Sequence, residues 1–249
     1  MKLSSFYKSF EEEIKPWNDK IQNMKIIFDI WVDVQREWVY LEGIFFGSGE
    51  IKAQLPNEYN RFRGIDNEFT SLMKKVSAKP KVFDVMSIEN LQKTLDRLVS
   101  SLATIKKALS DYLETQRQAF SRFYFVGDED LLEIIGNSKD ILNIQKHFPK
   151  MFAGITYILN ENNGDTLMGM RSKEGEEVNF NDNIKISESK RIDEWLKLLE
   201  HQMKVSIASD LLTASKEIAG VEDLSTIEKF EPFKQALIRH SSQASMLSS

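Results

Sequence analysis

A repeated spacing of apolar residues in the middle of the chain constrains the fold more than any other feature. Between residues 88 and 112, apolar side chains recur in alternating steps of three and four. This heptad pattern places them on one face of an α-helix that packs against other helices. The run comprises Ile88, Leu91, Leu95, Leu98, Leu102, Ile105, Leu109 and Tyr112. Since a serine commonly caps a helix N-terminus, we expect this helix to begin at Ser87 and to bury Leu98 and Leu102.

Two more helices are predicted before the heptad, over residues 18–46 and 57–76. Their apolar residues also fall in steps of three and four. In the first helix these residues are Ile21, Met24, Ile27, Phe28, Trp31, Val34, Trp38, Leu41 and Phe45. Gly47 and Gly49 end the first helix, and Pro80 ends the second. Only 11 Gly and 5 Pro occur in 249 residues, which favours long helices over a turn-rich β fold.

The pattern becomes irregular after residue 126. Short helices are expected to residue 153, interrupted at Gly127, Gly136 and Pro149. Residues 154–187 are predicted to form three short strands, 155–159, 166–171 and 176–180, joined by polar turns. A helix returns from about residue 188, another is expected to begin near Asp223, and a serine-rich, frayed tail follows.

The predicted fold is therefore mostly α: an elongated bundle of long helices with a small inserted β-meander. Five segments are expected along the chain. They are a long-helix block (1–126), a short-helix connection (127–153), the β-meander (154–187), C-terminal helices (188–240) and the tail (241–249). The tryptophans Trp31, Trp38 and Trp195 lie in apolar stripes and are expected in the core.

Composition excludes several classes of function. The chain has no Cys, which excludes a disulfide scaffold, a thiolate zinc site and a cysteine nucleophile. Its 33 Lys and Arg against 38 Asp and Glu give a net charge of −5, which argues against nucleic acid as a partner. No apolar run approaches the ~20 residues of a membrane span, so we expect no span and a soluble protein of the cytoplasm or nucleus.

No catalytic, cofactor-binding or metal-binding motif is predicted. The nearest approach to a phosphate-binding loop runs from Gly164 to Gly169, but it lacks the following Lys and hydroxyl. The three histidines are far apart in sequence and match no metal motif: His147, His201 and His240. Asp128, Glu129 and Asp130 are expected to serve as a helix cap and to complement the helix dipole.

Several stretches between residues 20 and 210 match one known family in order. They include 38–45 (WVYLEGIF), 51–56 (IKAQLP), 109–117 (LSDYLETQR), 120–135 (FSRFYFVGDEDLLEII) and 172–178 (SKEGEEV). In this combination the chain resembles the linker region of dynein heavy chains. Each stretch alone is a weak signal, but together they are specific. The chain departs from the family pattern at Ser121, where Pro is common, and at Gln116, where Lys is common. The resemblance favours the cytoplasmic over the axonemal branch.

This resemblance implies a mechanical role and no chemistry in this segment. The linker of that family arches over a ring of AAA+ modules in the same chain and transmits the ATP-driven powerstroke of a minus-end-directed microtubule motor. ATP and Mg²⁺ would bind in the ring of the parent chain, a motor ATPase. The implied partners are that ring, microtubules, accessory dynein chains and a second heavy chain in a dimer. The implied location is the cytoplasm and its cytoskeleton.

Two sets of residues become candidates in that role. The polar turn of the β-meander is a candidate contact with the ring: Asn160, Asn162, Asn163, Gly164 and Asp165. The interruptions Gly127, Gly136 and Pro149 are candidate flex points between stiffer helical blocks. The alternative reading is a spectrin-like helical adaptor without a motor role, which the heptad would serve equally well. A second alternative is an enzyme with an unfamiliar site. A nucleotide-binding or turnover assay would distinguish such an enzyme from a linker.

Overall fold

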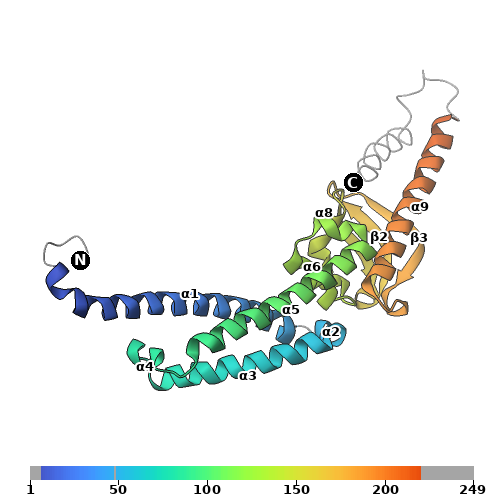
Figure 1. The fold of residues 1–249 in the computed structure, drawn as a ribbon. Coiled ribbons are helices and arrows are strands. Elements are labelled where there is room, and N and C mark those ends of the chain that lie inside the picture. The colour runs from blue at the N-terminus through green and yellow to red at the C-terminus, as the bar shows by residue number, and fades with distance from the viewer. Residues whose placement is uncertain (1–6, 48, 220–249) are drawn as a thin grey trace. The chain divides into compact units, whose positions relative to one another are not determined.

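Long helices form the first part of the chain, and a small sheet with one long helix lies in the second part (Figure 1). The computed structural model describes residues 7–47 and 49–219. The chain divides into two compact units, Met1–Asp111 and Tyr112–Ser249. The predicted class, mostly α with a small β insertion, is confirmed. The helix expected near Asp223 and the tail 241–249 lie outside the described residues.

The first unit consists of helices. Its elements are η1 (Tyr7–Phe10), α1 (Glu11–Gly47), α2 (Gly49–Gln54), α3 (Pro56–Ala78), α4 (Val82–Met86) and the greater part of α5 (Leu91–Ala119). The expected burial of Leu98 and Leu102 is confirmed, since each side chain is only 1% exposed. The division between the units falls inside α5, whereas the sequence analysis ended its N-terminal block at residue 126.

Polar contacts tie the three long helices of the first unit together. The indole Nε1 of Trp38 on α1 donates to Asp66 Oδ1 on α3 at 3.1 Å. Lys106 on α5 pairs with Glu37 on α1 at 2.6 Å. Arg97 on α5 pairs with Glu68 on α3. These contacts lie at the rim of a core of buried apolar side chains, so packing supplies most of the stabilisation.

Two predicted helix starts differ from the structure. Helix α1 begins at Glu11, upstream of Pro16, because three consecutive carboxylates in its first turn favour the helix dipole there. The prediction that Ser87 caps the heptad helix is wrong. Ser87 ends α4, with its hydroxyl donating to Asp84 O at 2.7 Å, and Asn90 takes a left-handed φ of 57° before α5 begins at Leu91.

The second unit places short helices and a sheet beside a long helix. Its elements after α5 are η2 (Ser121–Phe125), α6 (Asp128–Gly136), α7 (Ile141–Ile144), η3 (Gln145–His147), α8 (Phe148–Met151), β1 (Ile155–Glu161), η4 (Asn162–Gly164), β2 (Thr166–Ser172), β3 (Glu177–Lys185), η5 (Ile186–Glu188) and α9 (Ile192–Ala219). The sheet is antiparallel in the order β1-β2-β3, as a meander requires.

The sheet shares its core with α9. The inward residues of β3, Val178, Phe180 and Ile184, are buried, and α9 packs along this strand (Figure 1). At Gly169 a Cβ would stand 2.5 Å from the carbonyl oxygen of Val178, so only glycine permits this backbone approach. Within the described residues, none of the helices is both long and apolar enough to cross a membrane.

Candidate functional site

Helix α6 presents two carboxylates on one side. It begins after Gly127, and four of its apolar side chains are buried: Leu131, Leu132, Ile134 and Ile135. Asp130 and Glu133, three residues apart, therefore share the opposite face. The prediction that Asp128 caps this helix is wrong. Gly127 is the N-cap residue and no side chain caps it, while Asp128 instead pairs with Arg117 at 2.6 Å.

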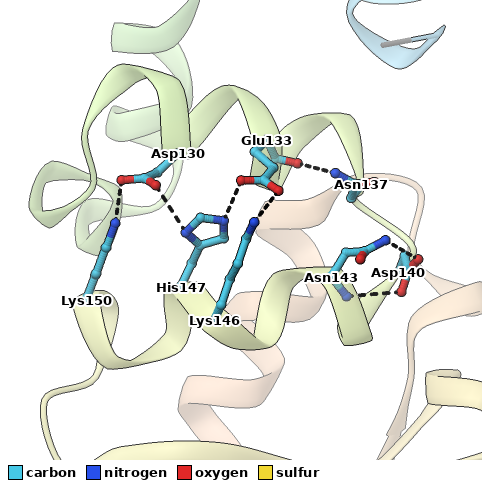
Figure 2. Close-up of polar contacts among 8 residues, drawn as sticks. All are labelled: Asp130, Glu133, Asn137, Asp140, Asn143, Lys146, His147 and Lys150. Carbon is cyan, nitrogen blue, oxygen red and sulfur yellow. Dashed lines mark hydrogen bonds and ion pairs between the residues drawn. The ribbon is translucent and has the colours of Figure 1, made fainter. Parts of the chain in front are cut away.

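The facing segment carries three basic side chains on the short turns from α7 to α8. Asp140 caps α7 and fixes the start of this segment, since its Oδ1 accepts from the backbone N–H groups of Leu142 (3.1 Å) and Asn143 (3.3 Å). The following turns direct Lys146, His147 and Lys150 toward α6 (Figure 2). His147 is 2% exposed, whereas both lysine side chains reach solvent.

The two carboxylates and three basic groups form one cluster, which we call the α6 clamp. Lys146 Nζ lies 2.5 Å from Glu133 Oε1, and Lys150 Nζ lies 2.6 Å from Asp130 Oδ2. The imidazole of His147 stands between the acids, with Nε2 3.2 Å from Glu133 Oε2 and Nδ1 3.5 Å from Asp130 Oδ1 (Figure 2). The clamp therefore joins α6 to the 145–151 segment at four points.

The clamp keeps both acids ionised. A hydrogen bond from Lys150 lowers the pKa of Asp130, and partial burial opposes this shift only in part. A hydrogen bond from Lys146 lowers the pKa of Glu133 in the same way, again against partial burial. The positive charges of the neighbouring lysines add to both effects. Neither carboxyl is therefore suited to donate a proton near neutral pH.

Three residues of the clamp have side chains of the kind that bind metal ions. Asp130, Glu133 and His147 offer ligand atoms within 4.8 Å of one another. However, the imidazole meets the two acids with opposite ring nitrogens. Each carboxylate also already holds an ammonium group. This arrangement favours a structural clamp over a metal centre.

Acid should weaken the second unit through these two carboxylates. Because their folded-state pKa values are lowered, their stabilisation is complete above the ordinary values of 3.8 and 4.5. It is lost as the pH falls through the lowered folded-state values. We expect the double variant Asp130→Asn, Glu133→Gln to be less stable than the wild type at pH 7 and to lose less stability in acid. Urea unfolding from pH 7 to pH 3, with Glu129→Gln on the same helix as control, measures this. A double variant with the wild-type pH slope contradicts the expectation.

Three other side chains make hydrogen bonds that fix the segments around the clamp. The buried amide of Gln145 pairs with β1 like an additional strand, donating to Ile158 O at 2.8 Å and accepting from Ile158 N at 3.0 Å. Arg122 donates to Met151 O at 2.9 Å and lies 3.6 Å from Glu200 on α9. The indole of Trp195 on α9 donates to Ser138 O at 3.0 Å. These bonds link the α6–α8 segment to the sheet and to α9.

The candidate contact turn is held in place by its own neighbours. Asn162 and Asn163 take left-handed φ angles of 52° and 56°. A Cβ at Gly164, where φ is 93°, would stand 2.5 Å from the Ile141 side chain. Asp165 accepts from the backbone and the hydroxyl of Ser187, each at 2.9 Å. Asn160 donates to Ile158 O at 2.9 Å. The turn is thus a fixed surface feature, separate from the clamp.

The candidate flex points all lie in the second unit. Gly127 precedes α6 in an extended conformation, Gly136 is the last residue of α6, and Pro149 lies in the first turn of α8. The clamp spans the segment that contains Gly136 and Pro149. Whether these positions bend stays a prediction.

The clamp was not predicted from the sequence, in which His147 is an isolated histidine and Asp130 an acid at a helix start. The available signal was a pair of acids three residues apart, Asp130 and Glu133, followed by bases at 146, 147 and 150 with similar spacing. Such spacing shows which residues share a face within each segment, but it does not show that the two faces contact each other.

The clamp contains neither a hydroxyl nor a thiol nucleophile, and its charges are mutually neutralised. Its ion pairs join α6 to the 145–151 segment within the second unit. The model of the family described as "Dynein heavy chain, N-terminal region 2" matches residues 1–214. The chain therefore belongs to the dynein heavy chain family.

Curated relatives agree with the family match. Cytoplasmic dynein heavy chains are 60% identical over 213 residues in Paramecium tetraurelia, 52% over 223 in Drosophila melanogaster and 50% over 230 in Dictyostelium discoideum. These alignments cover 85%, 90% and 92% of this chain. The chain spans about 5% of the length of each relative.

Proposed function

We propose that this chain forms part of the mechanical linker of a cytoplasmic dynein heavy chain. In this proposal the segment bends over the AAA+ ring of its parent and transmits the ATP-driven powerstroke toward the microtubule minus end. The family match over residues 1–214 carries the proposal. The packed helices of the first unit and the clamp of the second support it, because a force-bearing element must resist local deformation.

The proposed partners follow from the same role. They are the AAA+ ring of the same heavy chain, microtubules and accessory chains bound by the parent, and a second heavy chain in a dimer. The parent would work in the cytoplasm on the cytoskeleton. The turn 160–165 is the proposed contact with the ring, because its rigid backbone presents polar side chains at a fixed place.

Distance measurements in the complete motor test the lever role. Spin labels at Lys25 and Lys107 both lie in the first unit, labels at Glu129 and Lys216 both lie in the second, and a Lys25–Lys216 pair spans the two. All four side chains are exposed. We expect the pair within the first unit to keep its distance with and without nucleotide, while the spanning pair changes.

The pair within the second unit locates the bend. A nucleotide-dependent change between Glu129 and Lys216 supports flexing at Gly136 or Pro149. A change confined to the spanning pair places the bend outside the clamp. If no pair changes while the motor still moves microtubules, this segment does not bend, and the lever proposal for it fails.

The isolated chain is expected not to bind ATP, because it lacks the backbone cradle and Lys of a phosphate-binding loop. Titration of a fluorescent ATP analogue at micromolar concentration with Mg²⁺ measures this. The parent heavy chain serves as the positive control. Stoichiometric, Mg²⁺-dependent binding by the 249-residue chain would contradict the expectation and favour the enzyme alternative.

A further inference from the structure

Helix α1 carries a second apolar face that the rest of the first unit leaves exposed. Six large side chains on it are between 39% and 58% exposed. We call this set the α1 stripe: Trp17, Ile21, Phe28, Val32, Val39 and Phe46. The prediction that Ile21 and Phe28 share the buried face of Trp31 is wrong, since Ile21 is 58% and Phe28 39% exposed.

The stripe is straight and separate from the buried face. Its members follow one another in steps of four and seven residues, so at 3.6 residues per turn they fall within about 60° of the helix circumference. At 1.5 Å per residue the stripe is about 44 Å long. The buried residues of α1 are centred roughly 100–120° away around the helix. They are Ile27, Trp31, Val34, Leu41 and Phe45.

The stripe is held rigid by the core beneath it. Phe28 stacks on Trp31, with ring centroids 6.3 Å apart and planes 17° apart. At one end Trp17 meets Phe83 edge-on at 6.0 Å. At the other end Phe46 lies 6.0 Å from Phe62. A binding surface that is already ordered loses little conformational entropy when a partner docks. Exposed apolar side chains gathered on one face in this way are typical of interaction sites.

We propose that the α1 stripe docks an amphipathic α-helix supplied by the parent heavy chain from outside these 249 residues. A straight row at steps of four and seven matches the ridges and grooves of another helix. Lys25, Asp29 and Arg36 follow one margin of the row, so the partner helix carries charges of both signs there.

The length of the relatives supports an occupant within the same chain. This chain spans about 5% of them, so the rest of a heavy chain is tethered to the stripe at high effective concentration. A membrane is the poorer occupant, because surface-binding helices carry a basic polar face and α1 carries many acids there. Among these acids are Glu11, Glu12, Asp19, Asp29 and Asp33. The proposal rests on family membership and not on the lever role.

Cysteine accessibility tests the proposal, since this chain has no Cys of its own. Val32→Cys and Val39→Cys probe the stripe. Gln22→Cys on α1 and Asn60→Cys on α3 replace exposed polar residues and serve as controls. Each variant is labelled with a maleimide in the isolated chain and in purified parent heavy chain free of accessory chains. Peptide mass spectrometry reads the labelling rate at each position.

We expect the stripe cysteines to react about tenfold or more slowly in the heavy chain than in the isolated chain, while the controls react equally in both. Cross-linking from Lys25 should then identify a heavy-chain helix outside these residues. Equal rates at all four positions would overturn the proposal. So would protection in the isolated chain that grows with concentration together with a dimer by light scattering, since a second copy would then cover the face. The assay needs no nucleotide, so its outcome is independent of the lever test.

Discussion

Replacing Trp195 by alanine should lower the free energy of unfolding of the second unit by about 3–5 kcal/mol. This side chain is 1% exposed and among the largest fully buried ones in the described chain. Its truncation leaves a cavity between α9 and the α6–α8 segment. It also removes the 3.0 Å hydrogen bond that the indole donates to Ser138 O, so a buried carbonyl loses this donor.

Two further variants separate the contribution of packing from that of the hydrogen bond. Trp195→Phe keeps much of the packing and removes the indole N–H, so its cost should lie well below that of alanine. Leu198→Ala lies on the same helix but at a 50% exposed position, and its effect should stay within about 0.5 kcal/mol. Urea unfolding with hydrogen exchange in β1–β3 as the local readout measures all three. An alanine variant as stable as the Leu198→Ala control would show that α9 does not hold this unit.

The long helices were predictable because their periodicity is local. Each heptad residue of α5 from Leu91 to Leu109 is set three or four positions from the next, and the structure buries this row. Periodicity could not locate the helix start, because Ser87 and Asn90 both suit helix ends and turns. The left-handed φ of Asn90 sets the start of α5 at the next residue, because this backbone conformation cannot continue a right-handed helix. That angle depends on how the chain turns from α4 into α5.

The extent of the sheet was harder to predict. The third strand was expected over 176–180 but runs from Glu177 to Lys185. Its continuation, Asn181, Asp182 and Asn183, is polar and does not favour strands. Tertiary contacts override this preference, since the hydroxyl of Ser206 on α9 accepts from Asn181 N at 3.0 Å and Gln202 donates to Asp182 at 3.3 Å.

The clamp and the α1 stripe could not be predicted for a common reason. Both depend on which faces of the helices meet, and a single sequence gives only the spacing within each helix. Lys150 and Asp130 are 20 residues apart and meet only when α8 packs beside α6. Likewise, the apolar residues of α1 form one broad stripe in sequence, and only packing shows that α3 and α5 cover part of it.

Shortening Leu98 or Leu102 should destabilise the first unit by about 2–5 kcal/mol for each change to alanine. Both side chains are 1% exposed and belong to the row of α5 that faces the core. Because they stand about one turn apart and share neighbours, the double variant is expected to deviate from the sum of the single ones. Val99→Ala, at a 38% exposed position between them, is the matched control.

Hydrogen exchange identifies the helices that lose protection in these variants. With either leucine shortened, amides of α1 and α3 should exchange faster, because these helices pack on α5 in the first unit. A loss below about 0.5 kcal/mol in both single variants would mean that the row does not carry the core.

Hydrogen exchange in the strands β1–β3 of the same variants tests whether the two units unfold together, since α5 continues past Asp111 into the second unit. If their amides keep wild-type protection, the two units unfold separately. Equal loss in the sheet would instead show that α5 joins them into one cooperative system.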